Sequence, residues 1–167
     1  FGLTWQLILT DPAGETRPFI VPSLLFADKE TNRAEEAIQY YVSVFKDAKV
    51  GSLARYSEGV DPNQPGSLMF GDFMLANQWF SAMDSGIDHD FAFNEAVSFA
   101  VQCKDQAEID FYWEKLSSDP QFEQCGWCKD PFGVSWQIIP EDIEELMERP
   151  DAYANMMDMK KLIIDDF

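Results

Sequence analysis

Histidine and cysteine side chains are the residues of this chain whose types and spacing could support chemistry. The sequence contains one histidine, His89, which lies between Asp88 and Asp90 in a polar stretch. Imidazole exchanges protons near neutral pH, and neighbouring carboxylates favour its protonated form. His89 is therefore a candidate acid or base, and a solvated loop position is the alternative.

The spacing Cys125-x-x-Cys128 could serve redox chemistry or zinc binding. Zinc needs two further ligands, and Cys103 and His89 are only loosely placed to supply them. Redox pairs of this spacing sit at a helix N-terminus, where the thiolate is stabilised, whereas this pair falls in a predicted strand. Residues i and i+3 of a strand point to opposite faces, so we expect the two sulfur atoms to diverge.

The balance of charges excludes several classes of partner. The 167 residues include 30 acidic and 12 basic side chains, which give a formal net charge of −18. Phosphate backbones and anionic membranes attract surfaces of the opposite sign, so neither a nucleic acid nor a membrane is an expected partner. The three cysteines come without a secretory signature, and no apolar run is long enough to span a bilayer. The sequence therefore predicts a cytoplasmic protein with reduced thiols.

The first half of the chain predicts a β-α-β-β-β module over residues 19–84. A buried strand is expected in the apolar run Phe19–Ala27, with Pro22 at its start or at an irregular edge. An amphipathic helix is expected over Asn32–Phe45, with Asn32 as its N-cap. Further strands are expected over residues 49–56, 67–73 and 78–83, and the last two pair as a hairpin.

The same order repeats in residues 95–140, which predict a second module. A strand over Ala96–Cys103 is followed by a helix whose N-cap is Asp105. The stretch Cys125–Pro140 predicts two short strands joined by a tight turn, in which Gly133 supplies positive φ. Residues 141–167 then predict a tail of short acidic helices.

The end of the second module has another copy at the start of the chain. Phe132–Pro140 matches Phe1–Leu9 position by position, with identical or conservatively changed residues up to the last position, where Pro140 stands against Leu9. Residues 1–10 are therefore predicted to be a strand left from a preceding tandem unit, and residues 11–18 a linker. A strand without its partner has an unpaired edge, so we expect it to lie against a sheet of this chain or of a neighbouring one.

Several stretches carry a family resemblance: the Pro-x-Leu-x-Phe strand at Pro22–Phe26, the helix Ala34–Phe45, and the segments Phe93–Phe99, Tyr112–Leu116 and Cys125–Gln137. Together they resemble the PhnB-like, 3-demethylubiquinone methyltransferase-like branch of the glyoxalase/bleomycin-resistance (vicinal oxygen chelate) superfamily. The resemblance implies an α+β fold in which paired βαβββ modules form an incomplete barrel around a small-molecule cavity, followed here by C-terminal helices. It also implies a homodimer. No cofactor is expected, because the sequence lacks the Gly-rich strand-turn-helix fingerprint of nucleotide-like cofactors.

The resemblance also assigns cavity positions. Metal-dependent members of the superfamily place His and Glu ligands on four strands, and strand register puts the matching positions of this chain at Val21–Ser23, Ser81, Ser98 and Gln137. None of these is His, Glu or Asp, and hydroxyl or amide groups alone bind divalent metals poorly. No metal is therefore expected. The predicted ligand cavity consists of Ser81, Ser98 and Gln137 together with Trp79, Phe99 and Trp136.

Three functions are compatible with this sequence. The first is a metal-free protein that binds an uncharged or weakly polar small molecule. The second is an enzyme of the same superfamily that uses His89 or Glu95, near the predicted cavity mouth, for proton transfer on a small carbonyl or quinone-like substrate. The third is an interaction module whose acidic tail docks a partner through Met156, Met157 and Met159, because thioethers suit adaptable surfaces.

Overall fold

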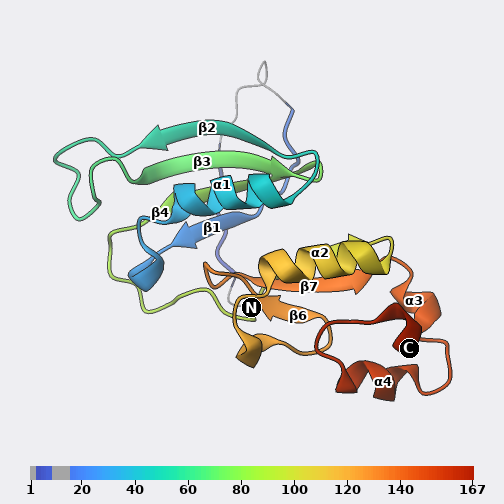
Figure 1. Ribbon diagram of the computed structural model, residues 1–167. Coiled ribbons are helices and arrows are strands. Elements are labelled where there is room, and N and C mark those ends of the chain that lie inside the picture. The colour runs from blue at the N-terminus through green and yellow to red at the C-terminus, as the bar shows by residue number, and fades with distance from the viewer. Residues whose placement is uncertain (1–2, 9–15) are drawn as a thin grey trace.

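The first half of the protein forms a four-stranded sheet that is covered on one face by a helix (Figure 1). The computed structural model describes residues 3–8 and 16–167. The elements of this half are β1 (Ser23–Phe26), α1 (Ala34–Val44), β2 (Lys49–Arg55), β3 (Leu68–Leu75) and β4 (Gln78–Asp84). The sheet order is β1-β4-β3-β2, in which β1 is parallel to β4 and the other neighbours are antiparallel. This is the β-α-β-β-β order that the sequence predicts.

The predicted hairpin of β3 and β4 forms through a two-residue turn. Ala76 and Asn77, between β3 and β4, have φ values of 45° and 65°, and positive φ at both positions is what a two-residue hairpin turn requires. Pro22 directly precedes β1, and its carbonyl oxygen accepts a hydrogen bond from the Ser81 N–H at 2.9 Å. Proline at the start of a strand loses no ladder hydrogen bond.

Two predicted strands are wrong in extent. Of the run Phe19–Ala27, only Ser23–Phe26 pairs, and Phe19 and Ile20 are exposed. Pro22 cannot donate to a ladder, so the chain joins the sheet only after it. Residues 3–8 form no strand and are all exposed; the rest of that prediction, residues 1–2 and 9–10, lies outside the described residues. An apolar strand is stable only where a sheet edge pairs with it, and residues 3–8 pair with no strand in the described part of this chain. The expected pairing with a neighbouring chain stays a prediction.

The N-terminus of α1 is capped from a distant strand, so the prediction of Asn32 as N-cap is wrong. Asn32 has a φ of 68°, and its side chain donates to Gln64 at 2.8 Å. The buried carboxylate of Asp84, at the end of β4, instead accepts from the Ala34 N–H at 3.0 Å and from the Leu68 N–H at 2.8 Å. Burial raises the pKa of Asp84, and these backbone donors oppose the rise. The Asp84 carboxylate thus joins the end of β4 to the start of α1 and to the start of β3.

The second half forms a three-stranded sheet with order β5-β7-β6. Its elements are β5 (Ser98–Cys103), α2 (Gln106–Leu116), β6 (Trp127–Lys129) and β7 (Ser135–Pro140). The strand β5 is parallel to β7, and β6 is antiparallel to it. Both sheets are mixed and neither closes into a barrel, which agrees with the predicted α+β fold and incomplete barrel.

The second module differs from the first between α2 and β6. There the chain forms a 3-10 turn at Pro120–Phe122 and a single bridge between Gln124 and Trp127, instead of a further strand. Asp105 is the N-cap of α2, as predicted: its side chain accepts a hydrogen bond from the Glu108 N–H at 2.9 Å.

One apolar core joins the two halves, and a carboxylate lies within it. The rings of Tyr41 on α1 and Trp136 on β7 meet there at 5.6 Å. Asp130 is only 3% exposed and accepts from the Tyr41 hydroxyl at 2.7 Å and from the Trp136 indole N–H at 2.8 Å. The backbone N–H groups of Phe132 and Val134 donate to its other oxygen, at 2.8 and 3.0 Å. The turn between β6 and β7 is therefore held to both halves by one fully bonded side chain.

The tail forms α3 (Ile143–Leu146), α4 (Ala152–Asp158) and a 3-10 turn at Ile164–Asp166, beyond the second sheet (Figure 1). The Cys125 and Gly126 N–H groups donate to the carbonyls of Met159 and Lys160, at 2.9 and 2.7 Å, which joins the tail to the start of β6. The buried residues of its own apolar cluster are Leu146, Ala152, Leu162 and Phe167. No helix in residues 3–8 and 16–167 is long and apolar enough to cross a membrane.

Candidate functional site on the open face of the second sheet

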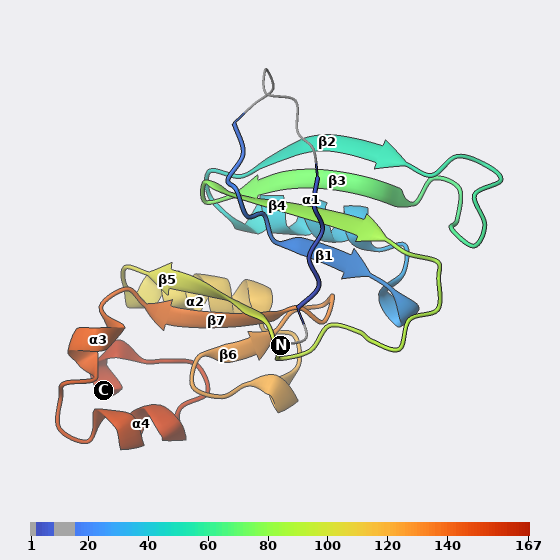
Figure 2. The same cartoon turned by 180° about the vertical axis from the view of Figure 1, so that it is seen from behind.

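The two faces of the second sheet have different surroundings. Trp136 and Ile138 of β7 point into the core that α2 covers, so the alternation of the strand places Ser135 and Gln137 on the opposite face. Residues paired across strands share a face. We therefore define the open face of this sheet by the residues Ser98, Trp127, Lys129, Ser135 and Gln137. Figure 2 shows both sheets from the side away from the helices.

Two of the predicted cavity residues meet on the open face. The Gln137 amide nitrogen donates to the Ser98 hydroxyl at 2.8 Å. Both side chains are half-buried, and Trp127 lies directly across the ladder from Gln137. This arrangement offers an amide oxygen and a hydroxyl beside an indole ring, which suits a polar but uncharged ligand group.

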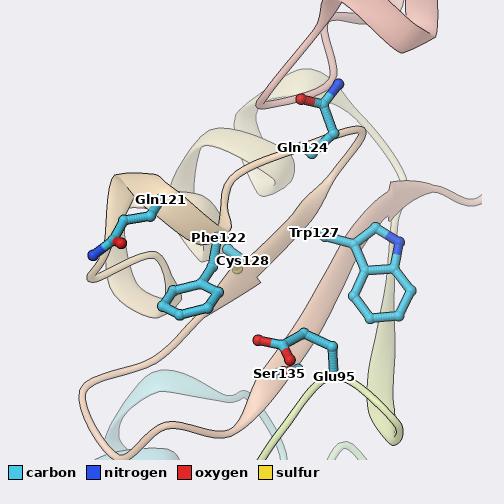
Figure 3. Close-up of a pocket in the computed structure, with 7 residues that line it drawn as sticks. All are labelled: Glu95, Gln121, Phe122, Gln124, Trp127, Cys128 and Ser135. Atoms are coloured by element: carbon cyan, nitrogen blue, oxygen red, sulfur yellow. The ribbon is translucent and has the colours of Figure 1, made fainter.

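A pocket of about 330 Å³ opens between β6, β7 and the segment that precedes them (Figure 3). Neither Gln137 nor Ser98 lines it, but their neighbours across the ladders, Trp127 and Ser135, do. Its volume is at the lower end of the range for small-molecule sites. The rings of Phe122 and Trp127 lie on opposite sides, and the Glu95 side chain lies between them at the lower edge of the view. The complete lining is Glu95, Gln121, Phe122, Gln124, Trp127, Cys128 and Ser135.

An ion pair lies at the edge of this pocket. The Lys129 ammonium donates to the Glu95 carboxylate, and its nitrogen lies 3.6 Å from the centre of the Phe122 ring. The hydrogen bond from Lys129 lowers the pKa of Glu95. A carboxylate with a lowered pKa is a weaker base, so this environment does not favour the role of Glu95 in proton transfer.

Ser135 was not among the predicted site residues, although it lines the pocket. Its side chain is 2% exposed, and its hydroxyl has no hydrogen-bond partner in the part of the chain that the structure describes. Its neighbours across the ladders are Ser98 and Lys129. The sequence alone could have indicated Ser135, because it precedes Gln137 by two positions in the predicted strand and therefore lies on the same face of the sheet.

The remaining predicted polar position, Ser81, belongs to the other sheet. It pairs with Ser23, and strand alternation places Trp79 on the same face of β4. Arg17 covers that face: its guanidinium carbon lies 3.4 Å from the centre of the Trp79 ring, and its Nη2 lies 2.9 Å from an Asp72 carboxylate oxygen. The predicted cavity residues are thus distributed over two sheets, and none of the six lines the pocket of Figure 3.

Phe99 and Trp136 lie in the core between the halves. Their rings are 5.5 Å apart, and Phe99 also meets Phe80 of the first sheet at 5.2 Å. Trp136 is 3% exposed, with its indole N–H bonded to Asp130. Since Trp136 and Gln137 are adjacent on one strand, they point to opposite faces.

His89 lies in the segment between the two modules. Its Nε2 is 2.9 Å from the Ser85 hydroxyl, and its ring is 4.8 Å from that of Phe91. It does not line the pocket of Figure 3. The proton-transfer role that the sequence suggests for His89 stays a prediction.

The two cysteines of the Cys-x-x-Cys spacing have different surroundings. Cys125 and Gly126, with φ values of 49° and 82°, form a two-residue turn between the bridged residues Gln124 and Trp127, so the prediction that Cys125 lies in a strand is wrong. The hairpin geometry favours positive φ at both turn positions. Cys128 is buried, and this raises its pKa to about 12. Neither thiol is in a disulfide, and a thiol with such a pKa is a poor nucleophile at neutral pH.

The side chains at the predicted metal positions do not fit a divalent ion. They supply the hydroxyl groups of Ser23, Ser81 and Ser98 and the amide of Gln137, and they lie on two sheets. In the described ranges, no group of three or more His, Cys, Asp or Glu side chains is placed to hold a metal ion. Divalent metals of this superfamily's type require imidazole or carboxylate ligands.

Comparisons with known proteins agree with the fold. The family model described as 3-demethylubiquinone-9 3-methyltransferase matches residues 18–139. Among solved structures, the PhnB protein from Bacillus cereus has 32% sequence identity and a TM-score of 0.62, and the match covers 73% of this chain and 99% of that one. No curated protein sequence matches the chain.

Two more distant structures show the fold alone. Protein PA1353 from Pseudomonas aeruginosa has 17% identity and a TM-score of 0.55, with 75% of this chain and 98% of that one covered. The fosfomycin resistance protein FosX from Mesorhizobium loti has 17% identity and a TM-score of 0.50, with 81% and 100% covered.

Proposed function

The chain belongs to the family described as 3-demethylubiquinone-9 3-methyltransferase, within the glyoxalase/bleomycin-resistance fold, and on that premise we propose that it is a metal-free protein that binds a small molecule. The proposed site is the open face of the second sheet. We do not propose methyl transfer, because the sequence lacks the Gly-rich fingerprint of a nucleotide-like cofactor.

The observation that carries the proposal is the hydrogen bond between Gln137 and Ser98. These residues occupy two positions at which the superfamily resemblance places metal ligands, and here they bond to each other as neutral groups. The adjoining pocket has ring walls and an ion pair whose charges cancel. Apolar walls with a few placed polar groups are typical of small-molecule sites.

The other two functions have less support. Glu95 is engaged by Lys129, and His89 lies outside the pocket. In the tail, Met156 and Met159 pack against the tail's own cluster, and only Met157 of the three is exposed. A homodimer and a cytoplasmic location stay predictions from the sequence.

Native mass spectrometry of the purified full chain, together with elemental analysis, tests the proposal. We expect a bound organic molecule that is released on denaturation, and no stoichiometric divalent metal. The matched variant is Ser98→Ala combined with Gln137→Leu, which removes the polar pair and should lose the molecule while the unfolding midpoint shows that the protein is folded. A stoichiometric divalent ion, or retention of the molecule by the folded double variant, would contradict the proposal.

A further inference from the structure

The hydroxyl of Ser135 is buried at the base of the pocket without a partner. Ser135 is 2% exposed, and its hydroxyl oxygen has no hydrogen-bond partner among the described residues. A buried hydroxyl that makes no hydrogen bond costs free energy relative to an alanine in the same place. The neighbouring hydroxyl of Ser98 differs, because it accepts a hydrogen bond from Gln137.

The walls around Ser135 indicate the shape of a ligand. Figure 3 shows the Trp127 and Phe122 rings on opposite sides of the pocket, and Ser135 is also among its lining residues. Aromatic rings attract other rings in offset or edge-on contact. The pocket holds about 330 Å³, which limits the ligand to a small molecule of one or two rings.

The charges around the pocket argue for an uncharged ligand. Lys129 is the cation nearest to Ser135 in the ladder, and it is already paired with Glu95. The net charge of the chain is −18, which repels anions over a longer range. A free cation would meet the Lys129 ammonium that covers the Phe122 ring.

We propose that Ser135 is the polar anchor of a binding site for an uncharged ring compound that carries one hydroxyl or carbonyl group. The ring lies between Trp127 and Phe122, and its polar group exchanges a hydrogen bond with the Ser135 hydroxyl. This inference rests on the proposed function, of which it names the ligand class and the anchoring residue.

A pair of probes isolates the contribution of this hydroxyl. Phenol and toluene have nearly the same shape, but only phenol has a group that can bond to Ser135. Their affinities for the full-length wild-type chain and for Ser135→Ala are measured by NMR titration, with the Trp127 indole N–H signal as the reporter. We expect phenol to bind Ser135→Ala about tenfold more weakly than wild type, the change that one lost hydrogen bond produces. Toluene should bind both proteins equally.

The matched control is Ser117→Ala, because the Ser117 hydroxyl already donates to the Glu123 carboxylate at 2.7 Å and Ser117 does not line the pocket. It should leave the ratio of phenol to toluene affinity unchanged. Without ligand, Ser135→Ala should raise the urea midpoint and Ser117→Ala should lower it. Ser135→Cys replaces the hydroxyl by a larger, weakly donating thiol; as a second variant, it should also weaken phenol binding more than toluene binding.

Three results would overturn the inference: equal losses for phenol and toluene in Ser135→Ala, a lower urea midpoint for that variant, or no binding of phenol to the wild type. Each is distinguishable from failure of the proposed function. If mass spectrometry finds an organic ligand whose retention depends on Ser98 and Gln137 but not on Ser135, the proposed function stands and the anchoring role of Ser135 is refuted.

Discussion

Replacing Asp130 by asparagine tests whether one carboxylate holds the two halves of the protein together. One oxygen of Asp130 accepts from the backbone N–H groups of Phe132 and Val134, and the other accepts from Tyr41 and Trp136. Asparagine has the same shape, but one of its two polar ends is a donor. The substitution therefore changes the hydrogen bonds and leaves the packing nearly unchanged.

The loss of stability in Asp130→Asn depends on which hydrogen-bond partners of Asp130 can also bond to an amide. If the amide oxygen of Asp130→Asn keeps the two backbone donors, its NH₂ group faces Tyr41 and Trp136. The Tyr41 hydroxyl can rotate and accept, but the indole N–H can only donate, so Trp136 is left buried and unpaired. The opposite orientation would leave both backbone donors unpaired and is worse. Losing a hydrogen bond to a charged acceptor costs about 1.5–3 kcal/mol.

A double-mutant cycle with Trp136→Phe measures this value. Phenylalanine has no N–H group, so Asp130→Asn should be less destabilising in that background by about 1.5–3 kcal/mol. Urea unfolding at pH 7, followed by far-UV circular dichroism, gives the four free energies of unfolding. Equal destabilisation by Asp130→Asn in both backgrounds would refute the assignment of the cost to the indole–carboxylate bond.

The pH dependence of the same variant has a definite sign. Burial raises the pKa of Asp130 above its unfolded value, and the hydrogen bonds from Trp136 and Tyr41 oppose that rise. A raised pKa contributes stability that is complete below the unfolded value and is lost as the pH rises through the folded value. The amide cannot titrate. The destabilisation by Asp130→Asn should therefore be larger at acid pH than at pH 7, and an increase with pH would contradict this.

Three further predictions concern other sites. Asp84→Ala should destabilise the protein by about 3 kcal/mol in urea unfolding, because it leaves the N–H groups of Ala34 and Leu68 unpaired. Asn32→Gly should cost only a few tenths of a kcal/mol, because glycine tolerates the positive φ at this position. Equal effects of the two substitutions would restore Asn32 as the cap. Arg17→Ala should increase acrylamide quenching of Trp79, measured as the difference from the same experiment in a Trp79→Phe background, and unchanged quenching would show that Arg17 does not cover the ring. A thiol reagent should modify Cys125 in the folded protein and all three cysteines only in denaturant, because the other two are buried with pKa values of about 12; rapid reaction of all three in the folded protein would contradict their burial.

The residues that sequence reasoning placed correctly act through near neighbours. Asp105 caps α2 through an N–H three positions away, and Ala76 and Asn77 turn the chain within their own hairpin. Gln137 shares a face with Ser135 because strand alternation has a fixed period, whereas Ser98 joins them only through the register of β5 with β7. For the same reason Trp136 had to point away from Gln137, so both could not face one cavity.

The sequence by itself determined the family, the order of the elements and the neutral chemistry of the predicted metal positions, because motifs, periodicity and residue types are local properties. Only the tertiary structure decided which carboxylate caps α1, since Asp84 lies 50 positions from Ala34. It also decided that Arg17 covers Trp79 and that the hydroxyl of Ser135 is buried without a partner. Burial and partnership depend on segments brought together by folding, and no spacing along the chain encodes them.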